Sequence, residues 1–143
     1  MDFQNFSSYS FLLDRTSRRV KQYAQTQFKK QNFGVTVDQW IILKKLNEIK
    51  GCSQSDLAEL TNKDAPTLTR IIDLLVGKAL LERQIDTEDR RKFFVCLTPV
   101  GIQTVQDLSP KIDNIRQQAW QDMTQADFEH FKSILEKIYK NLA

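Results

Sequence analysis

The sequence predicts a mainly α-helical domain that carries one small β-hairpin. Apolar residues recur every three to four positions in several long segments, and this spacing places them on one face of an α-helix. Two short runs rich in β-forming residues, 80–85 and 92–97, interrupt the helical pattern and are joined by a charged turn. Two short helical patterns precede this hairpin directly, so the order of elements predicts a winged helix-turn-helix.

The length of 143 residues fits one domain with one hydrophobic core. Hydrophobic residues make up 41% and charged residues 27%, as in ordinary globular proteins. We expect a single domain over 1–143, in which a winged-helix DNA-binding lobe (36–99) lies between two parts of a helical dimerisation region (1–35 and 100–143).

No apolar run approaches the roughly 20 residues that cross a bilayer, which predicts that the chain has no membrane partner. The first residues also lack the basic and long apolar segments of a signal peptide. We therefore expect a cytoplasmic protein.

The first predicted helix covers residues 8–30 and has more apolar surface than one helix can hide. We expect part of this surface to meet another subunit, while packing inside the same domain is the alternative. The stripe at helical spacing comprises Tyr9, Leu13, Thr16, Val20, Tyr23 and Gln27.

Capping residues mark the starts of the next two helices. Thr36 is the predicted N-cap of a buried helix that continues to about Ile49 and is ended by Gly51. Ser53 is the predicted N-cap of a short helix, which the turn at 61–63 follows.

The helix predicted over 64–77 has one apolar and one polar face. Asp64 is its predicted N-cap, and Pro66 suits its first turn. Its apolar face carries Leu68, Ile71, Ile72 and Leu75, and its opposite face carries Pro66, Thr69, Arg70 and Asp73. Such a helix fits a DNA major groove, where Thr and Arg reach base edges. A merely solvated polar face is the alternative.

The turn between the two strand patterns ends in consecutive arginines, Arg90 and Arg91. A hairpin tip of this kind fits the narrow minor groove, where the potential is most negative. Asp89 is close enough to hold an arginine by a charge-assisted hydrogen bond. We therefore expect Asp89 to orient that arginine side chain rather than to neutralise its charge. Taken alone, the segment is an ordinary charged loop, but the helices before it favour a wing.

Two further helices follow the hairpin. Thr98 is the predicted N-cap of a long helix whose apolar stripe reaches Met123, and Pro110 inside it predicts a kink near Ser109. Thr124 starts a last helix with apolar residues Phe128, Phe131, Ile134, Leu135, Ile138 and Leu142 on one face. With the first helix, these two could form a dimer interface. Two-fold symmetry would then place two recognition helices roughly 34–36 Å apart.

The sequence supplies no catalytic constellation and predicts a protein that is not an enzyme. Phosphate-binding glycine loops and the HExxH pattern are missing, and His130 is the one histidine. Cys52 and Cys96 are far apart and, with one histidine, do not supply the ligands of a zinc site. We therefore expect no metal and no cofactor. The net charge of +3 is only weak evidence for a nucleic-acid partner.

With these residues assembled, the chain resembles the MarR family of bacterial transcription regulators. The most specific segment is DTEDRRKFFVCLTPVG, an acid-rich turn with DRR that leads into a strand and LTxxG. The preceding segments SQSDLAELT and APTLTRIIDLLVGKALLER also fit. The resemblance is strongest over Ser53 to Gly101 and extends, with lower specificity, over nearly the whole chain.

The resemblance implies a winged-helix homodimer that binds a palindromic operator in double-stranded DNA, as a repressor or, less often, an activator. It places Pro66, Thr67, Thr69 and Arg70 on the recognition helix. It also places Arg91 as the minor-groove arginine, Asp89 as its bracing acid and Arg90 as a candidate for phosphate contact. Where the family usually has a glycine before the first strand of the wing, this chain has Lys78-Ala79-Leu80, so the turn into the wing is expected to differ slightly.

Many family members respond to small phenolic or aromatic anions held between the dimer helices and the DNA-reading lobe. The resemblance therefore implies a small aromatic ligand that releases the operator. The candidate neighbours of its pocket are Arg15, Arg18, Arg19, Tyr23 and Trp40, with ordinary core packing as the alternative for Trp40.

Two other functions stay open. One is a thiol redox-sensing regulator that uses Cys52, although the peroxide-sensing branch carries its cysteine in the first helix and this chain has none there. An inert thiol is the expectation for Cys96. The other function is a winged-helix module that binds protein instead of DNA. The arginines on the exposed helix face and on the wing argue against it.

Overall fold

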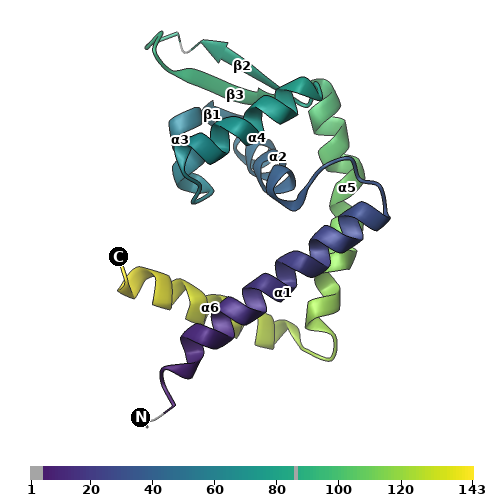
Figure 1. The fold of residues 1–143 in the computed structure, drawn as a ribbon, viewed down its shortest axis with the longest axis vertical. Coiled ribbons are helices and arrows are strands. Elements are labelled where there is room, and N and C mark those ends of the chain that lie inside the picture. Colours follow the sequence, from purple (N-terminus) through teal and green to yellow (C-terminus); the bar gives the residue numbers. More distant parts are fainter. Residues whose placement is uncertain (1–4, 86) are drawn as a thin grey trace.

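The computed structural model describes residues 5–85 and 87–143, so Asp86 at the start of the predicted wing turn lies outside the described residues. Helices dominate the fold, and three short strands form one sheet (Figure 1). The mainly α winged helix-turn-helix predicted from the sequence is confirmed. In chain order the elements are α1 (Ser8–Lys30), α2 (Val37–Ile49), β1 (Cys52–Ser53), α3 (Gln54–Leu60), α4 (Ala65–Gly77), β2 (Leu81–Ile85), β3 (Phe93–Leu97), α5 (Pro99–Gln117), the 3-10 helix η1 (Gln118–Trp120) and α6 (Gln125–Asn141).

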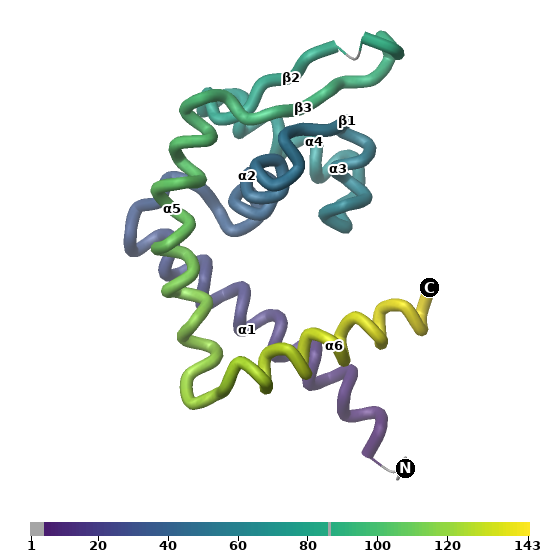
Figure 2. The backbone as a smooth tube through the Cα atoms, turned by 180° about the vertical axis from the view of Figure 1, so that it is seen from behind, coloured from purple at the N-terminus to yellow at the C-terminus, as the bar shows by residue number. Residues whose placement is uncertain are grey.

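The molecule has two parts that α5 connects. The elements from α2 to β3 form a winged lobe (residues 37–97), and the wing (residues 81–97) is its β2–β3 hairpin. Helices α1 and α6, called the arms below, lie away from the wing at the other end of α5 (Figures 1 and 2). This arrangement leaves the wing and the arms at opposite ends of the chain's longest direction.

Side-chain caps set the helix starts where the sequence predicted them. Thr36 Oγ1 accepts a hydrogen bond from the Gln39 backbone N–H at 3.1 Å, and Gln39 Oε1 accepts one from the Thr36 N–H at 3.1 Å. This reciprocal pair is a capping box that satisfies two otherwise unpaired backbone donors. The predicted caps Ser53, Asp64, Thr98 and Thr124 each accept a comparable bond.

The sheet has one strand more than the sequence predicted. Its order is β1-β3-β2 with antiparallel neighbours, and Cys52 and Ser53 of β1 lie opposite Val95 and Phe94 of β3. A strand of two residues is too short for its side chains to show a period of two. The predicted two-stranded hairpin is therefore the larger part of a three-stranded sheet.

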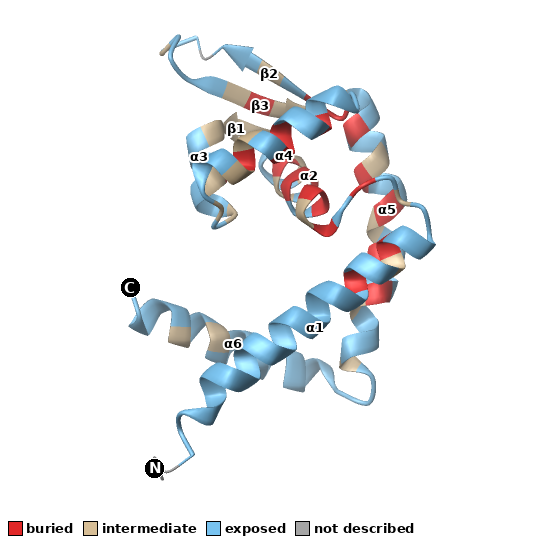
Figure 3. Ribbon diagram, in the orientation of Figure 1, coloured by how far each residue is buried: buried red, intermediate tan, exposed pale blue. Residues whose placement is uncertain are grey.

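The hydrophobic core lies in the winged lobe and continues to the crossing of α1 with α5 (Figure 3). The largest fully buried side chains all belong to the lobe: Ile42, Leu43, Leu46, Leu57, Leu68, Ile72, Leu75, Leu81 and Val95. Their burial fixes α4 and the wing on one common support.

The long helix α5 ends earlier than its apolar stripe predicted. It stops at Gln117, η1 follows, and Asp122 has φ +64° in the turn to α6, whereas the stripe extended to Met123. The ring of Trp120 packs against Phe128 with centroids 5.1 Å apart, so an aromatic contact closes this corner. The helix runs through Pro110 without interruption. The predicted kink near Ser109 stays a prediction.

Candidate nucleic-acid interface

Helix α4 is anchored by one face and exposes the other. Leu68, Ile71, Ile72 and Leu75 are buried, as predicted. On the opposite face Pro66, Arg70 and Asp73 are exposed, while Thr67 and Thr69 are half-buried. Among the described residues, none forms a hydrogen bond or ion pair with the Arg70 guanidinium. Arg70 therefore keeps all its donors for a partner outside the chain.

Thr67, in contrast, serves the start of its own helix. Its backbone N–H donates to Asp64 Oδ1 at 2.8 Å. Hydrogen bonds from the Thr67 side chain and backbone hold the pKa of Asp64 below its ordinary value. The predicted contact residue Thr67 is thus part of the N-cap, and its side chain is less available to a partner than that of Arg70.

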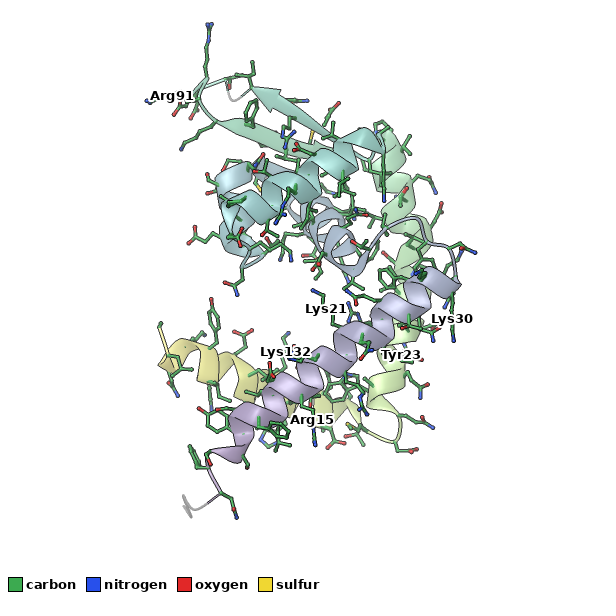
Figure 4. The ribbon with its side chains drawn as sticks, in the orientation of Figure 1. Arg15, Lys21, Tyr23, Lys30, Arg91 and Lys132 are labelled. Carbon is green, nitrogen blue, oxygen red and sulfur yellow. The ribbon has the colours of Figure 1, made fainter. Side chains whose placement is uncertain are left out.

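Arg91 lies at the far end of the wing (Figure 4). Asp89 Oδ1 accepts hydrogen bonds from the Arg91 backbone N–H at 3.0 Å and from Arg91 Nε at 3.3 Å. These bonds, the backbone one first, hold the pKa of Asp89 below its ordinary value. The Arg91 side chain is 91% exposed, and Arg90 beside it is also exposed. Asp89 therefore contacts Arg91 through Nε and leaves most of the guanidinium open to solvent.

An ion pair joins the wing to α4. Arg83 on β2 contacts Asp73 on α4 through Nη2 and Oδ1 at 2.6 Å, and Arg83 Nε donates to Gln54 Oε1 on α3 at 3.3 Å. Sequence reasoning missed Arg83 and Gln54. The spacing of residues shows which face Asp73 occupies but gives no information on its partner ten positions later.

In the turn into the wing, a residue other than glycine adopts the left-handed backbone conformation. Ala79 has φ +60°, a conformation that costs an L-residue roughly 1–2 kcal/mol. The Ala79 carbonyl accepts from Thr98 Oγ1 at 2.6 Å, and the Leu80 carbonyl accepts from the Thr98 N–H at 3.1 Å. Ala79 itself thus adopts the positive φ, and Thr98 holds both neighbouring carbonyls. The expectation that this turn differs slightly from that of the family stays a prediction.

Residues 35–93, from the start of α2 into β3, match the model of the MarR family. The helix-turn-helix region of this chain, residues 35–93, is therefore a MarR-family domain.

Two curated relatives of this chain are bacterial regulators. The HTH-type transcriptional repressor IacR of Pseudomonas putida is 25% identical over 132 residues, which are 92% of this chain and 78% of IacR. The uncharacterized HTH-type transcriptional regulator YwaE of Bacillus subtilis is 30% identical over 86 residues, and that match spans 60% of this chain but only 50% of YwaE.

Two solved structures have the same fold. The MepR–DNA complex from S. aureus superimposes with a TM-score of 0.81 at 27% identity, covering 93% of this chain and 97% of MepR. BpsR of Bordetella bronchiseptica, whose DNA binding is regulated by 6-hydroxynicotinic acid, superimposes with a TM-score of 0.82 at 28% identity over 91% of each chain. Together with the MarR domain match and the regulator relatives, they indicate a DNA-binding transcriptional regulator.

Two of the five candidate ligand residues, Arg19 and Tyr23, line the same cavity. It measures about 280 Å³, lies between α1 and the end of α5, and is lined by Thr16, Arg19, Val20, Tyr23, Ile115, Arg116, Gln118 and Ala119. Its wall is mostly apolar, but it includes the two arginines Arg19 and Arg116.

The other three candidates lie elsewhere. The Arg15 guanidinium stacks over the Phe11 ring at 5.5 Å, and Arg18 pairs with Asp14 at 3.1 Å on the surface of α1 (Figure 4). Trp40 is 3% exposed and belongs to the core, in line with the alternative stated for it. Arg116, which the sequence reasoning did not select, is the additional cationic residue of the cavity.

Asp38 links an arm to the helix-turn-helix. Its carboxylate accepts from Lys21 Nζ of α1 at 3.2 Å and from Lys63 Nζ, in the turn between α3 and α4, at 3.1 Å. Burial raises the pKa of Asp38, but the bonds from Lys63 and Lys21 outweigh it and leave that pKa below its ordinary value. Lys21 lies on the side of α1 that faces the lobe (Figure 4).

The two thiols have the electrostatics of unreactive cysteines. Burial raises the pKa of Cys52, and Asp56 adds to this effect. Burial also raises the pKa of Cys96, and a contact with Glu82 at 3.5 Å adds to it. Because the thiolate is the reactive form, both surroundings lower reactivity.

No helix within residues 5–85 and 87–143 is long and apolar enough to cross a membrane. In the same part of the chain, His, Cys, Asp and Glu nowhere form a group of three that could hold a metal ion.

The arms expose apolar surface that the lobe does not cover. No residue of α6 is buried, and the buried residues of α1 are Ala24 and Phe28 (Figure 3). On α6, Phe128, Phe131 and Ile134 are 38%, 45% and 44% exposed. Within the described part of this chain, the predicted apolar faces of both helices are therefore covered only in part, as where Trp120 packs on Phe128 and Phe131.

Proposed function

We propose that two copies of this chain bind a palindromic operator, repress transcription there, and release the DNA when a small aromatic anion binds. The observation that carries the proposal is the joint presentation of Arg70 and Arg91. Arg70 has no hydrogen-bond or ion-pair partner among the described residues, Arg91 is held by Asp89, and the 2.6 Å pair of Arg83 with Asp73 fixes their two elements to each other. A helix for the major groove and a wing for the minor groove thus form one unit.

The exposed arms support a homodimer. An amphipathic helix of 17 residues with no buried residue is unstable alone in water unless its apolar face finds a cover. A two-fold pairing of the arms covers both faces at once and places two α4 helices on successive major grooves. The operator would then be palindromic because the protein pair is symmetric.

Repression and ligand release are supported by separate observations. IacR, 25% identical over 92% of this chain, is a repressor. The cavity between α1 and α5 combines an apolar wall with Arg19 and Arg116, which suits a small aromatic ring bearing a carboxylate. BpsR, whose DNA binding 6-hydroxynicotinic acid regulates, has the same fold.

A titration on selected DNA tests the proposal. Duplexes that the wild-type protein binds are selected from a random pool, and fluorescence anisotropy measures affinity for selected and scrambled duplexes. Arg70→Ala should lose about 1–3 kcal/mol of binding free energy on the selected duplex and relax base preference. Arg90→Ala should weaken binding to both duplexes, because a phosphate contact is independent of sequence.

Lys111→Ala serves as the control, because Lys111 is an exposed cation on α5 outside this interface. It should leave both affinities unchanged. Wild-type affinity in both arginine variants would contradict the proposal and would favour a module that binds protein.

Ligand release is tested with the same duplex. Aromatic carboxylates such as 6-hydroxynicotinic acid are added to the complex, and DNA release is followed by anisotropy. Release by wild type but not by Arg19→Ala or Arg116→Ala would support the cavity, and release unaffected by both substitutions would exclude it. Release by peroxide that is lost in Cys52→Ser would favour the redox alternative.

A further inference from the structure

The hydroxyl group of Thr69 is already engaged inside the protein. Its Oγ1 donates to the Ala65 carbonyl oxygen at 2.9 Å and accepts from Gln54 Nε2 at 2.8 Å. A hydroxyl has one proton to donate. Thr69 therefore has no donor left for a base, although it lies on the half of α4 that a major groove would meet.

A chain of contacts holds this hydroxyl in place. Gln54 uses both ends of its amide, because Nε2 donates to Thr69 and Oε1 accepts from Arg83 Nε at 3.3 Å. Arg83 in turn contacts Asp73 at 2.6 Å, and its side chain is 24% exposed. The contacts connect α3, β2 and two turns of α4. Turning the Thr69 hydroxyl toward DNA would therefore break its bonds to Ala65 of α4 and Gln54 of α3 and leave the Gln54 amide donor unpaired.

The major groove offers few partners to such a threonine. Guanine presents the acceptors N7 and O6, and thymine presents the acceptor O4 and a C5-methyl group. A hydroxyl without a free proton cannot donate to any of these acceptors. Two parts of Thr69 remain for contact with a base edge: the second lone pair of the hydroxyl oxygen, which could only accept from an adenine or cytosine amine, and the methyl group.

We propose that Thr69 recognises a thymine through contact of its methyl group with the C5-methyl of the base, and that Gln54 and Arg83 are positioning residues for this contact. The proposal rests on operator binding as proposed above. It gives neighbouring residues of α4 opposite roles: Thr69 makes an apolar contact, whereas Arg70 keeps free donors for base acceptors.

Replacing thymine by deoxyuridine tests the contact, because it removes only the methyl group. In the selected operator each thymine is replaced in turn, symmetrically in both half-sites, and affinity is measured by anisotropy. One symmetric position should lose about fourfold per half-site, the value of one buried methyl group. At that position Thr69→Ser, which lacks the methyl, should bind the two duplexes equally. Thr69→Val, which keeps a methyl and lacks the hydroxyl, should retain the preference.

Three results would overturn the contact: equal affinity for thymine and deoxyuridine at every position of wild type, a preference that persists in Thr69→Ser, or loss of preference in Thr69→Val. The first is also the result expected if Thr69 accepted a bond from an adenine or cytosine amine through its second lone pair. If wild type bound no selected duplex, the proposed function would fail instead, so the two failures are distinguishable.

The positioning role has its own readout. Gln54→Ala should lower the thymine-over-deoxyuridine ratio at the Thr69 position while base preferences at the Arg70 position stay unchanged. Arg83→Met, which keeps a long side chain without the guanidinium, should lower the same ratio. A general loss of affinity with an unchanged ratio in both variants would overturn the positioning role.

Discussion

Helix α4 of the winged lobe and the two arms have similarly clear amphipathic patterns, yet α4 buries its apolar face, whereas the buried residues of the arms are Ala24 and Phe28 of α1. Ile72 in α4 is 0% exposed, whereas Ile134 in α6 is 44% exposed. Both residues belong to apolar stripes at helical spacing. The comparison shows that periodicity identifies which face of a helix must be covered, but whether the same chain covers it depends on what the other elements supply.

The buried polar side-chain atoms of the lobe also have hydrogen-bond partners. Within the described part of the chain, no buried side-chain nitrogen or oxygen lacks a hydrogen-bond partner. The buried polar groups of the lobe are therefore satisfied within the chain, whereas the exposed apolar side chains of the arms need a second surface. We infer that the lobe determines the stability of one chain and that the arms determine how two chains associate.

A matched pair of truncations should separate the two regions most strongly. Ile72→Ala should reduce the free energy of unfolding by about 2–5 kcal/mol, because it leaves a cavity in a filled core. Ile134→Ala should have little effect on a dilute chain and a larger one at high concentration, where association covers α6. Urea denaturation at two protein concentrations measures both effects. If both truncations reduced the free energy of unfolding by the same amount in dilute solution, α6 would pack within its own chain.

Placing a charge on the arm should disrupt association and, with it, operator affinity. Ile134→Asp introduces a carboxylate into a surface that we expect to be buried between two chains. Losing the second half-site should weaken operator binding about a hundredfold, the usual scale of a bivalent advantage. Anisotropy on the selected operator measures this loss. Gln106→Asp, on the exposed side of α5, adds the same charge outside the arms and should leave affinity within a small factor of wild type. A dimer that persists in the Ile134→Asp variant would show that Ile134 lies outside the dimer interface.

The turn into the wing should respond to glycine in the opposite sense from a helix. Ala79→Gly should increase the free energy of unfolding by about 1 kcal/mol, because Ala79 has φ +60°. Ala126→Gly, inside α6, should destabilise by a similar amount, because glycine loses more conformational freedom in a helix. Thermal denaturation compares the two variants. A destabilising Ala79→Gly would show that this turn is not strained.

The link between arm and lobe should have a small acid dependence. Since the pKa of Asp38 is lowered from its ordinary value of 3.8, its contribution to stability is fully present above that pH. It is lost as the pH falls through the lowered pKa of the folded protein. The stability difference between wild type and Asp38→Asn should therefore be constant near neutral pH and shrink below about pH 4. A stability difference between wild type and Asp38→Asn that is constant down to pH 2.5 would show that the Asp38 carboxylate does not stabilise this contact between arm and lobe.

Much of the fold follows from local signals. Thr36, Ser53, Asp64 and Thr98 begin helices where the sequence predicts, because capping depends on residues within three positions. The anchored face of α4 follows equally well from its spacing. The end of α5 does not, because Trp120 turns the chain through contacts with α6 that periodicity cannot show.

The candidate site is less predictable, because its decisive contacts join separate elements. The Asp89–Arg91 contact spans two residues and was expected. The Arg83–Asp73 pair and the Gln54–Thr69 bond connect residues 10 and 15 positions apart on different elements. Those contacts depend on how β2, α3 and α4 pack, and the sequence pattern contains no record of that packing.

Sedimentation equilibrium of the wild-type protein at micromolar concentration tests most directly the claim that the arms exist to pair two chains. The account predicts a species of twice the 16.7 kDa chain mass. It also predicts that Ile134→Asp, with its lobe still folded by circular dichroism, shifts to the mass of one chain. A wild-type protein that sediments at 16.7 kDa at all concentrations tested would contradict it.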